Sequence, residues 1–391
     1  MPTLNPGVLL CNAAFVMVGI TGNMIGPTYA NLTGRYGIPL ADGANFTSIQ
    51  AIGGTVAVLL AGRLLDRINA RYVLFTGAAL MAAALFLLIN TPILGVAYFA
   101  MIIYGVGMGS LLVGCNVAVT RLRPDRAAVN INLLNFTYGI GAILGPQLVN
   151  VALSQHNYLL AYMTGFIFAL LVALFFVGLS IPVPKQVPIT HTTSAHGLSL
   201  AALMPFVILL FVYVGMEVSF GAWIFTQLRL AASAPEAIAA LATSLFWGGF
   251  TAGRGIISLL GTRVSAPTWL RIGIITIGLG SAGLLLFGAS APASVICATL
   301  VGLGCGPVFP SALGLLRTAF PANFGTASGI VMAMGNVSVI IMPRLQGQLG
   351  NGQNGGIIVT FVAAIILLLV SPLVTPRPTP TGMMSPVSGQ D

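Results

Sequence analysis

The sequence predicts an all-α membrane protein with twelve transmembrane helices, arranged as two related halves of six helices. Three observations support this prediction. Of the 391 residues, 57% are hydrophobic and only 5% are charged, whereas about a quarter of the residues of a soluble domain are charged. The apolar stretches divide into about a dozen segments of spanning length, and motifs of the first half recur in the second. The bilayer is therefore the main solvent of this chain.

The spans follow from the length that a helix needs to cross the hydrocarbon core, which is about 20 residues. Charge-free intervals that are too long for one helix are divided by polar or proline-containing breaks, such as the one at 90–92. We place the spans at 8–30, 45–63, 72–90, 94–119, 129–152, 158–181, 199–223, 236–260, 268–287, 291–316, 324–345 and 355–374. An even number of spans puts both ends of the chain on one side of the membrane.

A constant offset relates the two halves of the sequence. Gly302 follows Gly105 by 197 residues, and Pro343 follows Pro146 by the same number. The same shift superimposes the glycines and other residues around them: Gly107 and Gly304, Gly109 and Gly306, Pro124 and Pro321, Leu148 and Leu345. A repeat of six spans implies a parallel duplication about an axis along the membrane normal, with a cavity between the halves.

The few cations predict the orientation, because Lys and Arg accumulate in cytoplasmic connections. Twelve of the fifteen fall on the side that carries the chain ends, namely Arg63, Arg67, Arg71, Arg121, Arg123, Arg126, Lys185, Arg254, Arg263, Arg271, Arg317 and Arg377. Arg35, Arg229 and Arg344 fall on the opposite side. We therefore expect cytoplasmic termini and an integral plasma-membrane protein, such as one of a bacterial inner membrane. This topology accounts for the net charge of +9 without a nucleic-acid partner.

The polar connection after the sixth span marks the division of the chain. We expect an N-terminal six-helix half at 1–181, a cytoplasmic linker at 182–198, a C-terminal half at 199–375 and a short cytoplasmic tail at 376–391. The four cysteines lie in apolar stretches and form no C-x-x-C pair, which indicates neither a disulfide framework nor a zinc site. No phosphate-binding loop occurs, which argues against ATP hydrolysis by this chain. We expect a protein that is not an enzyme and that has no cofactor and no bound metal.

Two short motifs, GRLLDRINAR at 62–71 and GIGAILGP at 139–146, resemble those of the major facilitator superfamily. The segment 62–71, GRLLDRINAR, is similar to its signature loop, with Asn69 and Ala70 in place of the usual glycine and basic residue. The segment 139–146, GIGAILGP, resembles its glycine-proline helix motif. The resemblance implies the major facilitator fold and an inner gate. We assign to that gate Gly62, Asp66, Arg67 and Arg71, together with Arg254.

Three further segments resemble the fucose-permease-like and sodium-glucose-transporter-like branches of this superfamily. They are the stretch from Tyr213 to Glu217 with Gly221 and Trp223, the stretch from Trp247 to Arg254, and the stretch from Gly304 to Pro310. Sugar/proton symporters of this type often use an acidic residue in the first span, and this chain has none there. The resemblance implies transport of a sugar-like solute.

Glu217 is the one acidic residue that the predicted spans place well inside the membrane. Ionised carboxylates are costly in hydrocarbon, so such a residue faces an aqueous cavity or a partner. A buried carboxyl group can gain and lose a proton during a transport cycle, and we expect Glu217 to couple transport to protons. A structural ion pair with Arg229 or Arg344 is the alternative role. Sodium is the alternative ion, since Asn, Ser and backbone oxygens can bind it.

Polar and aromatic side chains within the spans are the candidates for binding substrate. Amides donate and accept hydrogen bonds while rings cover apolar sugar faces, which suits a neutral hydroxyl-rich ligand. The candidates are Asn23, Asn116, Asn132, Asn135, Tyr138, Trp223, Trp247 and Asn336. For each asparagine, a hydrogen bond between helices is the competing role.

These observations predict a monomeric secondary transporter, surrounded by membrane lipids, that moves a small neutral polar solute by alternating access. An exporter or flippase of amphipathic drugs or lipids is the alternative, because few charges are embedded in the membrane. A non-transporting receptor or assembly factor is the second alternative. A cavity lined mainly by Leu, Phe and Met would favour the lipid or drug function, whereas a cavity lined by the candidate Asn and Trp residues would favour sugar.

Overall fold

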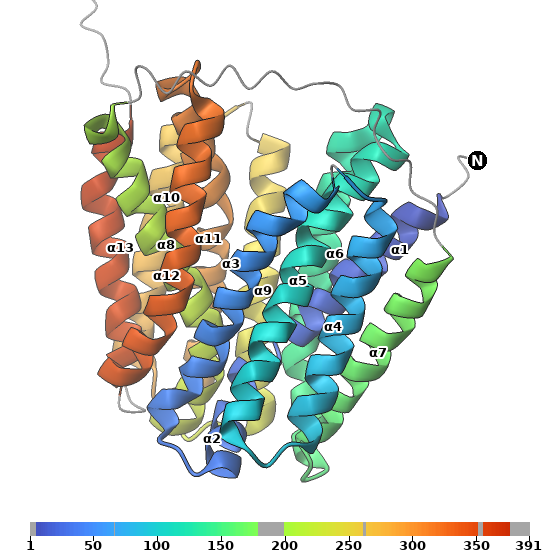
Figure 1. The fold of residues 1–391 in the computed structure, drawn as a ribbon. Helices are drawn as coiled ribbons and strands as arrows, with labels where there is room; N and C mark the ends of the chain where they lie inside the picture. The colour runs from blue at the N-terminus through green and yellow to red at the C-terminus, as the bar shows by residue number, and fades with distance from the viewer. Residues whose placement is uncertain (1–4, 66, 179–198, 261–262, 351–354, 376–391) are drawn as a thin grey trace, which may run out of the picture.

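The computed structural model describes residues 5–65, 67–178, 199–260, 263–350 and 355–375, and these residues form a bundle of long helices (Figure 1). The helices of the N-terminal half are α1 (Pro6–Gly22), α2 (Tyr29–Tyr36), α3 (Ala44–Leu65), α4 (Ala70–Asn90), α5 (Leu94–Leu122), α6 (Ala127–Ser154) and α7 (Leu159–Val177). Those of the C-terminal half are α8 (Leu200–Ala231), α9 (Glu236–Leu260), α10 (Ala266–Phe287), α11 (Ala291–Ala319), α12 (Phe324–Gly350) and α13 (Gly355–Val374). The predicted linker 182–198 and tail 376–391 lie outside the described residues.

The all-α membrane fold is confirmed. Eleven spans of the described chain are long and apolar enough to cross a membrane, and α1 and α2 count together as one of them. The more polar α9 is the twelfth long helix, and it packs along α11 within the bundle. The helix bounds match the predicted spans to within a few residues, except that the seventh span extends to Ala231 and the first continues through α2.

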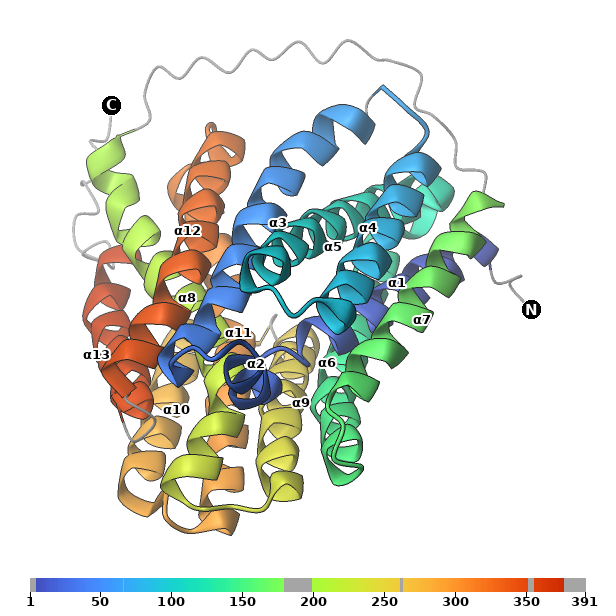
Figure 2. The same ribbon diagram turned by 60° about the horizontal axis from the view of Figure 1, so that its bottom comes forward.

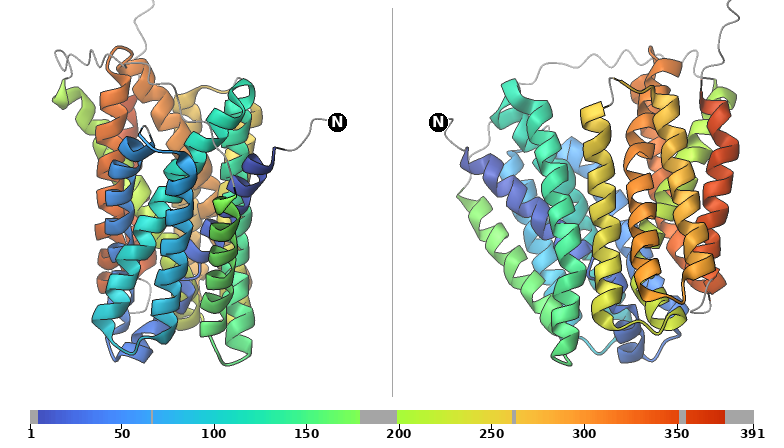
Figure 3. Two further views of the ribbon diagram at one scale, coloured as in Figure 1. Left: turned by 45° about the vertical axis from the view of Figure 1, so that its right-hand side comes forward. Right: turned by 180° about the vertical axis from the view of Figure 1, so that it is seen from behind.

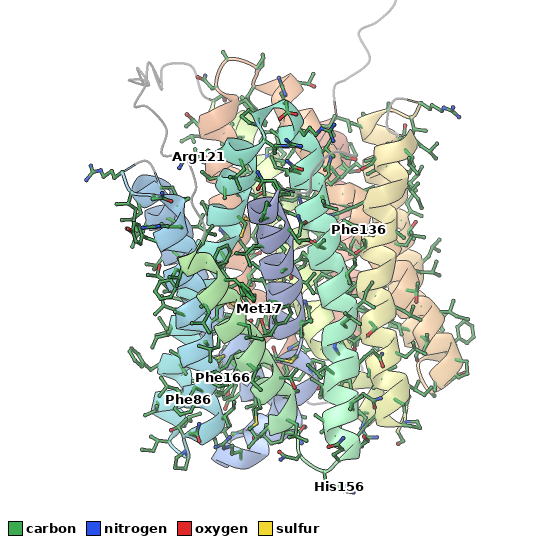
Figure 4. All side chains as sticks on the ribbon, turned by 90° about the vertical axis from the view of Figure 1, so that its right-hand side faces the viewer. Met17, Phe86, Arg121, Phe136, His156 and Phe166 are labelled. Atoms are coloured by element: carbon green, nitrogen blue, oxygen red, sulfur yellow. The ribbon has the colours of Figure 1, made fainter. Side chains whose placement is uncertain are left out.

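Side-chain caps and arginines fix several helix ends. Asn5 accepts hydrogen bonds from the backbone N–H of Gly7 at 2.9 Å, and Asn69 accepts one from that of Arg71 at 3.0 Å. Such asparagines satisfy donors that the first turn leaves without helical partners. At the C-terminal end of α3, the Arg121 guanidinium of α5 donates to the Leu65 carbonyl at 3.0 Å. Arg121 lies near the end of α5 in Figure 4.

The two halves repeat one packing pattern. In the N-terminal half α5 packs on α3 and α4, α1 on α6, and α4 on α7; in the other half α11 packs on α9 and α10, α8 on α12, and α10 on α13. Glycines at equivalent places make the close contacts. A Cβ on Gly107 would lie 2.5 Å from the carbonyl oxygen of Gly77, and one on Gly304 would lie 2.6 Å from that of Gly273. The duplication read from the sequence is therefore present in the backbone.

We call the end of the bundle where α1 begins, α7 ends, α8 begins and α13 ends the linker side, and the other end the opposite side. The halves contact each other through α6 with α9, α3 with α12, and the short helices η1 (Gly26–Thr28) and η2 (Leu40–Gly43) with α8 and α12. The short helices and α2 lie at the opposite side (Figure 2). From behind, α6 and α9 converge toward the opposite side and diverge toward the linker side (Figure 3, right).

Candidate transport site

A cavity of about 200 Å³ lies between the two halves. It is lined from the N-terminal half by α1, α3, α5 and α6, and from the C-terminal half by α8, α9 and α12. Its polar and aromatic lining residues are Asn23, Thr47, Gln50, Thr55, Tyr138, Trp247 and Asn336. The lining residues that the structure describes include no Asp, Glu, Lys or Arg. The cavity is thus polar in places but uncharged.

The first span is interrupted where it borders the cavity. α1 ends at Gly22, residues 23–25 form a turn, and η1 follows with Pro27. Proline has no N–H, so the Asn23 carbonyl cannot receive the hydrogen bond that a continuous helix would supply from residue 27. The Asn23 side chain turns back and donates to the Gly19 carbonyl at 2.8 Å. The break places a polar backbone segment at the cavity wall.

Glycines position the walls of the N-terminal half. A Cβ on Gly105 would overlap the carbonyl oxygen of Gln50 and lie 2.8 Å from the backbone nitrogen of Gly54. This close approach of α3 and α5 holds Gln50 at the cavity, where its amide nitrogen donates to the Met108 sulfur at 3.2 Å. Tyr138 of α6 lies next to the Asn23 side chain. Three polar side chains, from the turn after α1, from α3 and from α6, therefore share this wall.

The C-terminal half contributes one aromatic ring to the cavity lining, that of Trp247. The Trp247 ring lies 4.9 Å from that of Phe246 and 5.5 Å from that of Phe250, centroid to centroid. A Cβ on Gly221 of α8 would lie 2.8 Å from Cζ2 of Trp247, so the indole occupies the space that the glycine leaves open. Asn336 of α12 completes this side of the lining.

The two halves are pressed together at the opposite side. A Cβ on Gly26 of η1 would overlap the carbonyl oxygen of Ala222 in α8. Beside this contact, the rings of Tyr29 and Trp223 meet edge to face with centroids 4.9 Å apart. The Trp223 indole N–H donates to the Pro343 carbonyl at 2.8 Å. The cavity is closed on this side by backbone and aromatic contacts.

The halves are farther apart at the linker side. Gly139 of α6 still packs on Thr251 of α9. One and two turns nearer the linker side, Asn135 and Asn132 lie on the same helical face as Gly139, and both are exposed. Phe136 projects from α6 to the exterior (Figure 4) and is 55% exposed. The face of α6 that turns toward the C-terminal half is thus covered at mid-height and open at the linker side.

Glu217 lies within a polar cluster of the C-terminal half, beside the cavity. Its carboxyl group is close to the Tyr213 hydroxyl and within electrostatic range of Arg254. The Tyr213 hydroxyl donates to the Cys305 carbonyl at 2.8 Å. The cavity residue Tyr138 is in turn within electrostatic range of both Glu217 and Arg254. The acid predicted for coupling is therefore connected to the cavity without lining it.

The structure describes only some of the residues that the sequence assigns to the inner gate. Asp66 and the side-chain environment of Gly62 lie outside the described residues. Arg67 is exposed, and Arg71 donates to the Tyr72 hydroxyl at 2.7 Å. The Arg254 guanidinium lies 4.2 Å from the ring centroid of Phe250. Arg254 is also within electrostatic range of Glu217, and its membership in the gate stays a prediction.

The structure brings together half of the predicted substrate-binding residues. Asn23, Tyr138, Trp247 and Asn336 line the cavity, whereas Asn116, Asn132, Asn135 and Trp223 do not. Asn116 donates to its own helix at the Leu112 carbonyl, and Trp223 is used in the closure at the opposite side.

The main residue that sequence analysis missed is Gln50. A signal for it was present, because Thr47, Gln50, Gly54 and Val58 recur at spacings of three and four. This spacing puts them on one face of α3, and all four line the cavity.

Comparisons with known proteins agree with this architecture. The sequence profile described as "Major Facilitator Superfamily" matches residues 11–237. The chain is 25% identical to sodium-dependent glucose transporter 1 of Danio rerio, over 95% of this chain and 69% of that protein. It is also 25% identical to sodium-dependent glucose transporter 1A of Mus musculus, over 86% of this chain and 88% of that protein.

Two solved structures share the fold at low sequence identity. A mutant of the nucleoside transporter NupG superimposes with a TM-score of 0.79 and 16% identity, covering 95% of this chain and 99% of that one. A D-xylose-proton symporter superimposes with a TM-score of 0.77 and 13% identity, covering 94% and 96%.

Proposed function

The chain belongs to the Major Facilitator Superfamily and is a membrane transporter, and from this premise we propose that it moves a small neutral sugar-like solute by alternating access. The cavity between the halves is the substrate site. The observation that carries this proposal is the lining, which combines uncharged amides and hydroxyls with two aromatic rings and contains no charged residue among those described. Such groups match a solute that is rich in hydroxyls and has no net charge.

The size and composition of the cavity argue against the alternative cargoes. Its volume of about 200 Å³ is below the roughly 300–1,000 Å³ of pockets that hold drug-sized ligands. A lipid or drug cavity would be lined mainly by Leu, Phe and Met, but of these types the described lining holds Met108 and Leu112. The names of the relatives, which are glucose transporters, support the same solute class.

We propose that Glu217 couples transport to protons through a change of partner. The Tyr213 hydroxyl already donates to the Cys305 carbonyl, so its oxygen can accept a hydrogen bond from a protonated Glu217. An ionised Glu217 is drawn instead toward the Arg254 guanidinium. Loading and loss of a proton would then change the contact between α8 and α9 beside the cavity. The structural ion pair considered from the sequence would use Arg254 rather than Arg229, which contacts Glu236 at 3.4 Å.

The arrangement of the halves supports a place in the transport cycle. With the termini in the cytoplasm, as the distribution of arginines predicts, closure at the opposite side and opening at the linker side correspond to an inward-facing state. The contacts of Gly26 with Ala222 and of Tyr29 with Trp223 would then form the outer gate.

Uptake into proteoliposomes tests the proposal. We expect a radiolabelled monosaccharide from a panel that includes D-glucose, D-xylose and L-fucose to enter the vesicles when an ion gradient is imposed, and to exchange with unlabelled sugar without one. No uptake or exchange of any neutral hydroxylated solute, together with uptake of an amphipathic compound, would overturn the proposal.

The coupling role is tested with Glu217→Gln and its matched control Glu236→Gln, which alters an exposed acid at the opposite side. Uptake driven by a pH gradient should disappear in E217Q, while sugar exchange is retained, and E236Q should behave as the wild type. Persistence of pH-driven uptake in E217Q would eliminate the coupling role. Uptake by the wild type that responds to a sodium gradient alone would instead make sodium the coupling ion, in agreement with the names of the relatives.

A further inference from the structure

Two buried polar atoms that belong to residues of the cavity lining have no hydrogen-bond partner among the described residues. They are the side-chain oxygen Oε1 of Gln50 and the indole nitrogen Nε1 of Trp247. The exposed fractions of these residues are 8% and 6%. Buried polar groups are almost always paired, and leaving one unpaired is costly. A pair of such atoms in one cavity therefore points to a ligand that satisfies both.

The Gln50 oxygen is fixed as an acceptor. The amide nitrogen of the same side chain is engaged by the Met108 sulfur at 3.2 Å, and the backbone at Gln50 is held against Gly105 by the tight α3–α5 contact. The amide nitrogen is therefore engaged, and the carbonyl oxygen is the group of this side chain that has no partner among the described residues. That oxygen accepts hydrogen bonds and cannot donate them.

The Trp247 nitrogen is fixed as a donor. The indole ring is packed between Phe246 and Phe250 and against Gly221, so the ring has little freedom to turn. Its N–H donates and cannot accept. Trp247 belongs to α9, which occupies in the C-terminal half the place that α3 occupies in the N-terminal half. Gln50 and Trp247 therefore approach the cavity from the two sides of the axis that relates the halves.

We propose that the transported solute bridges Gln50 and Trp247, donating a hydroxyl hydrogen to the Gln50 oxygen and accepting the Trp247 N–H on a hydroxyl or ring oxygen. This inference rests on the proposed function and names the two side chains that bind its neutral polyhydroxylated substrate. A cation satisfies only the Gln50 oxygen and an anion only the Trp247 N–H, whereas a sugar offers a donor and an acceptor on one rigid frame.

The bridge has a mechanical consequence. Two hydrogen bonds between the halves join α6 and α9 toward the opposite side, where Gln147 donates to Ser244 at 3.1 Å and Ser244 donates to the Ile143 carbonyl at 2.7 Å. A ligand held by α3 and α9 adds a polar link nearer the centre. Binding therefore favours approach of the halves at the linker side, which is the movement that alternating access requires.

The test combines two variants with sugar analogues. Trp247→Phe keeps an aromatic ring and removes the N–H, and Gln50→Leu keeps much of the side-chain volume and removes the oxygen. We expect each to weaken binding of the sugar that the uptake panel identifies by about tenfold, the usual cost of one lost hydrogen bond in a closed site. In the wild type, removal of one particular hydroxyl of that sugar should weaken binding to the same degree, and Q50L should no longer discriminate against that deoxy analogue.

Trp269→Phe is the matched control, because it removes another buried indole N–H from a tryptophan of α10 that does not line the cavity, and we expect its sugar affinity to be unchanged. The deoxy series on the wild type needs no variant, so misfolding of a variant cannot hide the result. Wild-type affinity in both W247F and Q50L, with equal binding of every deoxy analogue, would show that water satisfies the two atoms and would overturn the bridge alone. Absence of binding of any neutral hydroxylated probe to the wild type would overturn the proposed function and the bridge with it.

Discussion

The contact between α3 and α5 in the N-terminal half and the contact between α9 and α11 in the C-terminal half use the same backbone positions. A Cβ on Gly105 would overlap the Gln50 carbonyl oxygen, and one on Gly302 would overlap the Phe246 carbonyl oxygen. One turn farther, a Cβ on Gly53 would lie 3.1 Å from the Val106 nitrogen, and one on Gly249 would lie 2.9 Å from the Leu303 nitrogen. Gln50 and Phe246 are therefore equivalent, as are the following residues Ala51 and Trp247.

The difference between the halves lies in the side chains that these matched backbones carry. Gln50 is equivalent to Phe246, and Ala51 is equivalent to Trp247. Of these four residues, Gln50, Ala51 and Trp247 line the cavity. Glycines preserve the close helix contacts because a backbone approach has no room for a side chain. The cavity side chains are free of that constraint. The duplication thus provides two similar scaffolds, and divergence at these positions places an amide on the α3 side of the cavity and an indole on the α9 side.

The largest expected effect comes from disrupting the shared backbone contacts. Gly105→Ala and Gly302→Ala each force a methyl group into a neighbouring carbonyl oxygen, and overpacking of this kind typically costs about 1–3 kcal/mol. We expect a lower thermal melting temperature of the detergent-solubilised protein, by a similar amount in both variants.

Two glycines on the same helices serve as controls. A Cβ on Gly95 of α5 or on Gly314 of α11 would meet no atom within 4 Å, so Gly95→Ala and Gly314→Ala should leave the melting temperature unchanged or slightly higher. Strong destabilisation by only one of G105A and G302A would contradict the equivalence of the two contacts.

The next effect concerns the contact between the halves, which must open during transport. Gly26→Ala places a methyl group against the Ala222 carbonyl oxygen and opposes closure at the opposite side. A cost of about 1.4 kcal/mol to the closed state shifts the conformational equilibrium roughly tenfold. A cysteine introduced at Ala51, which lines the cavity, should then react about tenfold faster with an impermeant maleimide supplied from the opposite side.

The labelling needs a background without the half-buried Cys297, for example Cys297→Ser, since the other three cysteines are buried. Gly34→Ala is the matched control, because a Cβ there would meet no atom within 4 Å. An unchanged labelling rate in G26A at wild-type melting temperature would show that this contact does not control access.

A smaller effect is expected at the aromatic part of the same closure. Trp223→Phe keeps a ring beside Tyr29 but removes the hydrogen bond to the Pro343 carbonyl, which positions the indole within the C-terminal half. The cost of about 1 kcal/mol for that bond therefore acts on the contact between the halves only through the position of the ring, and the labelling rate from the opposite side should rise by less than in G26A. Equal rates in the two variants would show that the position of the indole contributes as much to the closure as the backbone contact at Gly26.

The sequence predicted the spans well because each depends on a local property, the length of an apolar stretch. It also predicted the duplication, because glycines at close contacts tolerate no substitution by larger residues. The break in the first span was missed, although Gly26-Pro27 marks it, because hydropathy continues across the interruption and only packing against α8 fixes its shape.

The candidate site was less predictable, since hydropathy and composition do not tell which face of a helix meets the cavity. Asn116 and Asn23 look alike in the sequence, and both amides bond their own helices, but only Asn23 lies on the cavity. Trp223 and Trp247 differ in the same way. One is used between the halves and the other faces the substrate site, and that distinction depends on tertiary contacts more than 100 residues apart in the chain.

The smallest expected effect comes from exchanging a residue for its equivalent in the other half. The offset of 197 residues pairs Asn116 of α5 with Leu313 of α11, and both are half-buried. The Asn116 amide donates to the Leu112 carbonyl at 2.7 Å, an acceptor that the helix already serves, so Asn116→Leu removes no partner from another helix. We expect the free energy of unfolding to change by no more than about 0.5 kcal/mol and sugar exchange to be unchanged. Gln50→Phe, the corresponding exchange at a cavity position, should abolish exchange while the protein still folds. Loss of sugar exchange in N116L would contradict this expectation. It would show that Asn116 contributes to the substrate site and that the cavity extends along α5 in another state of the cycle.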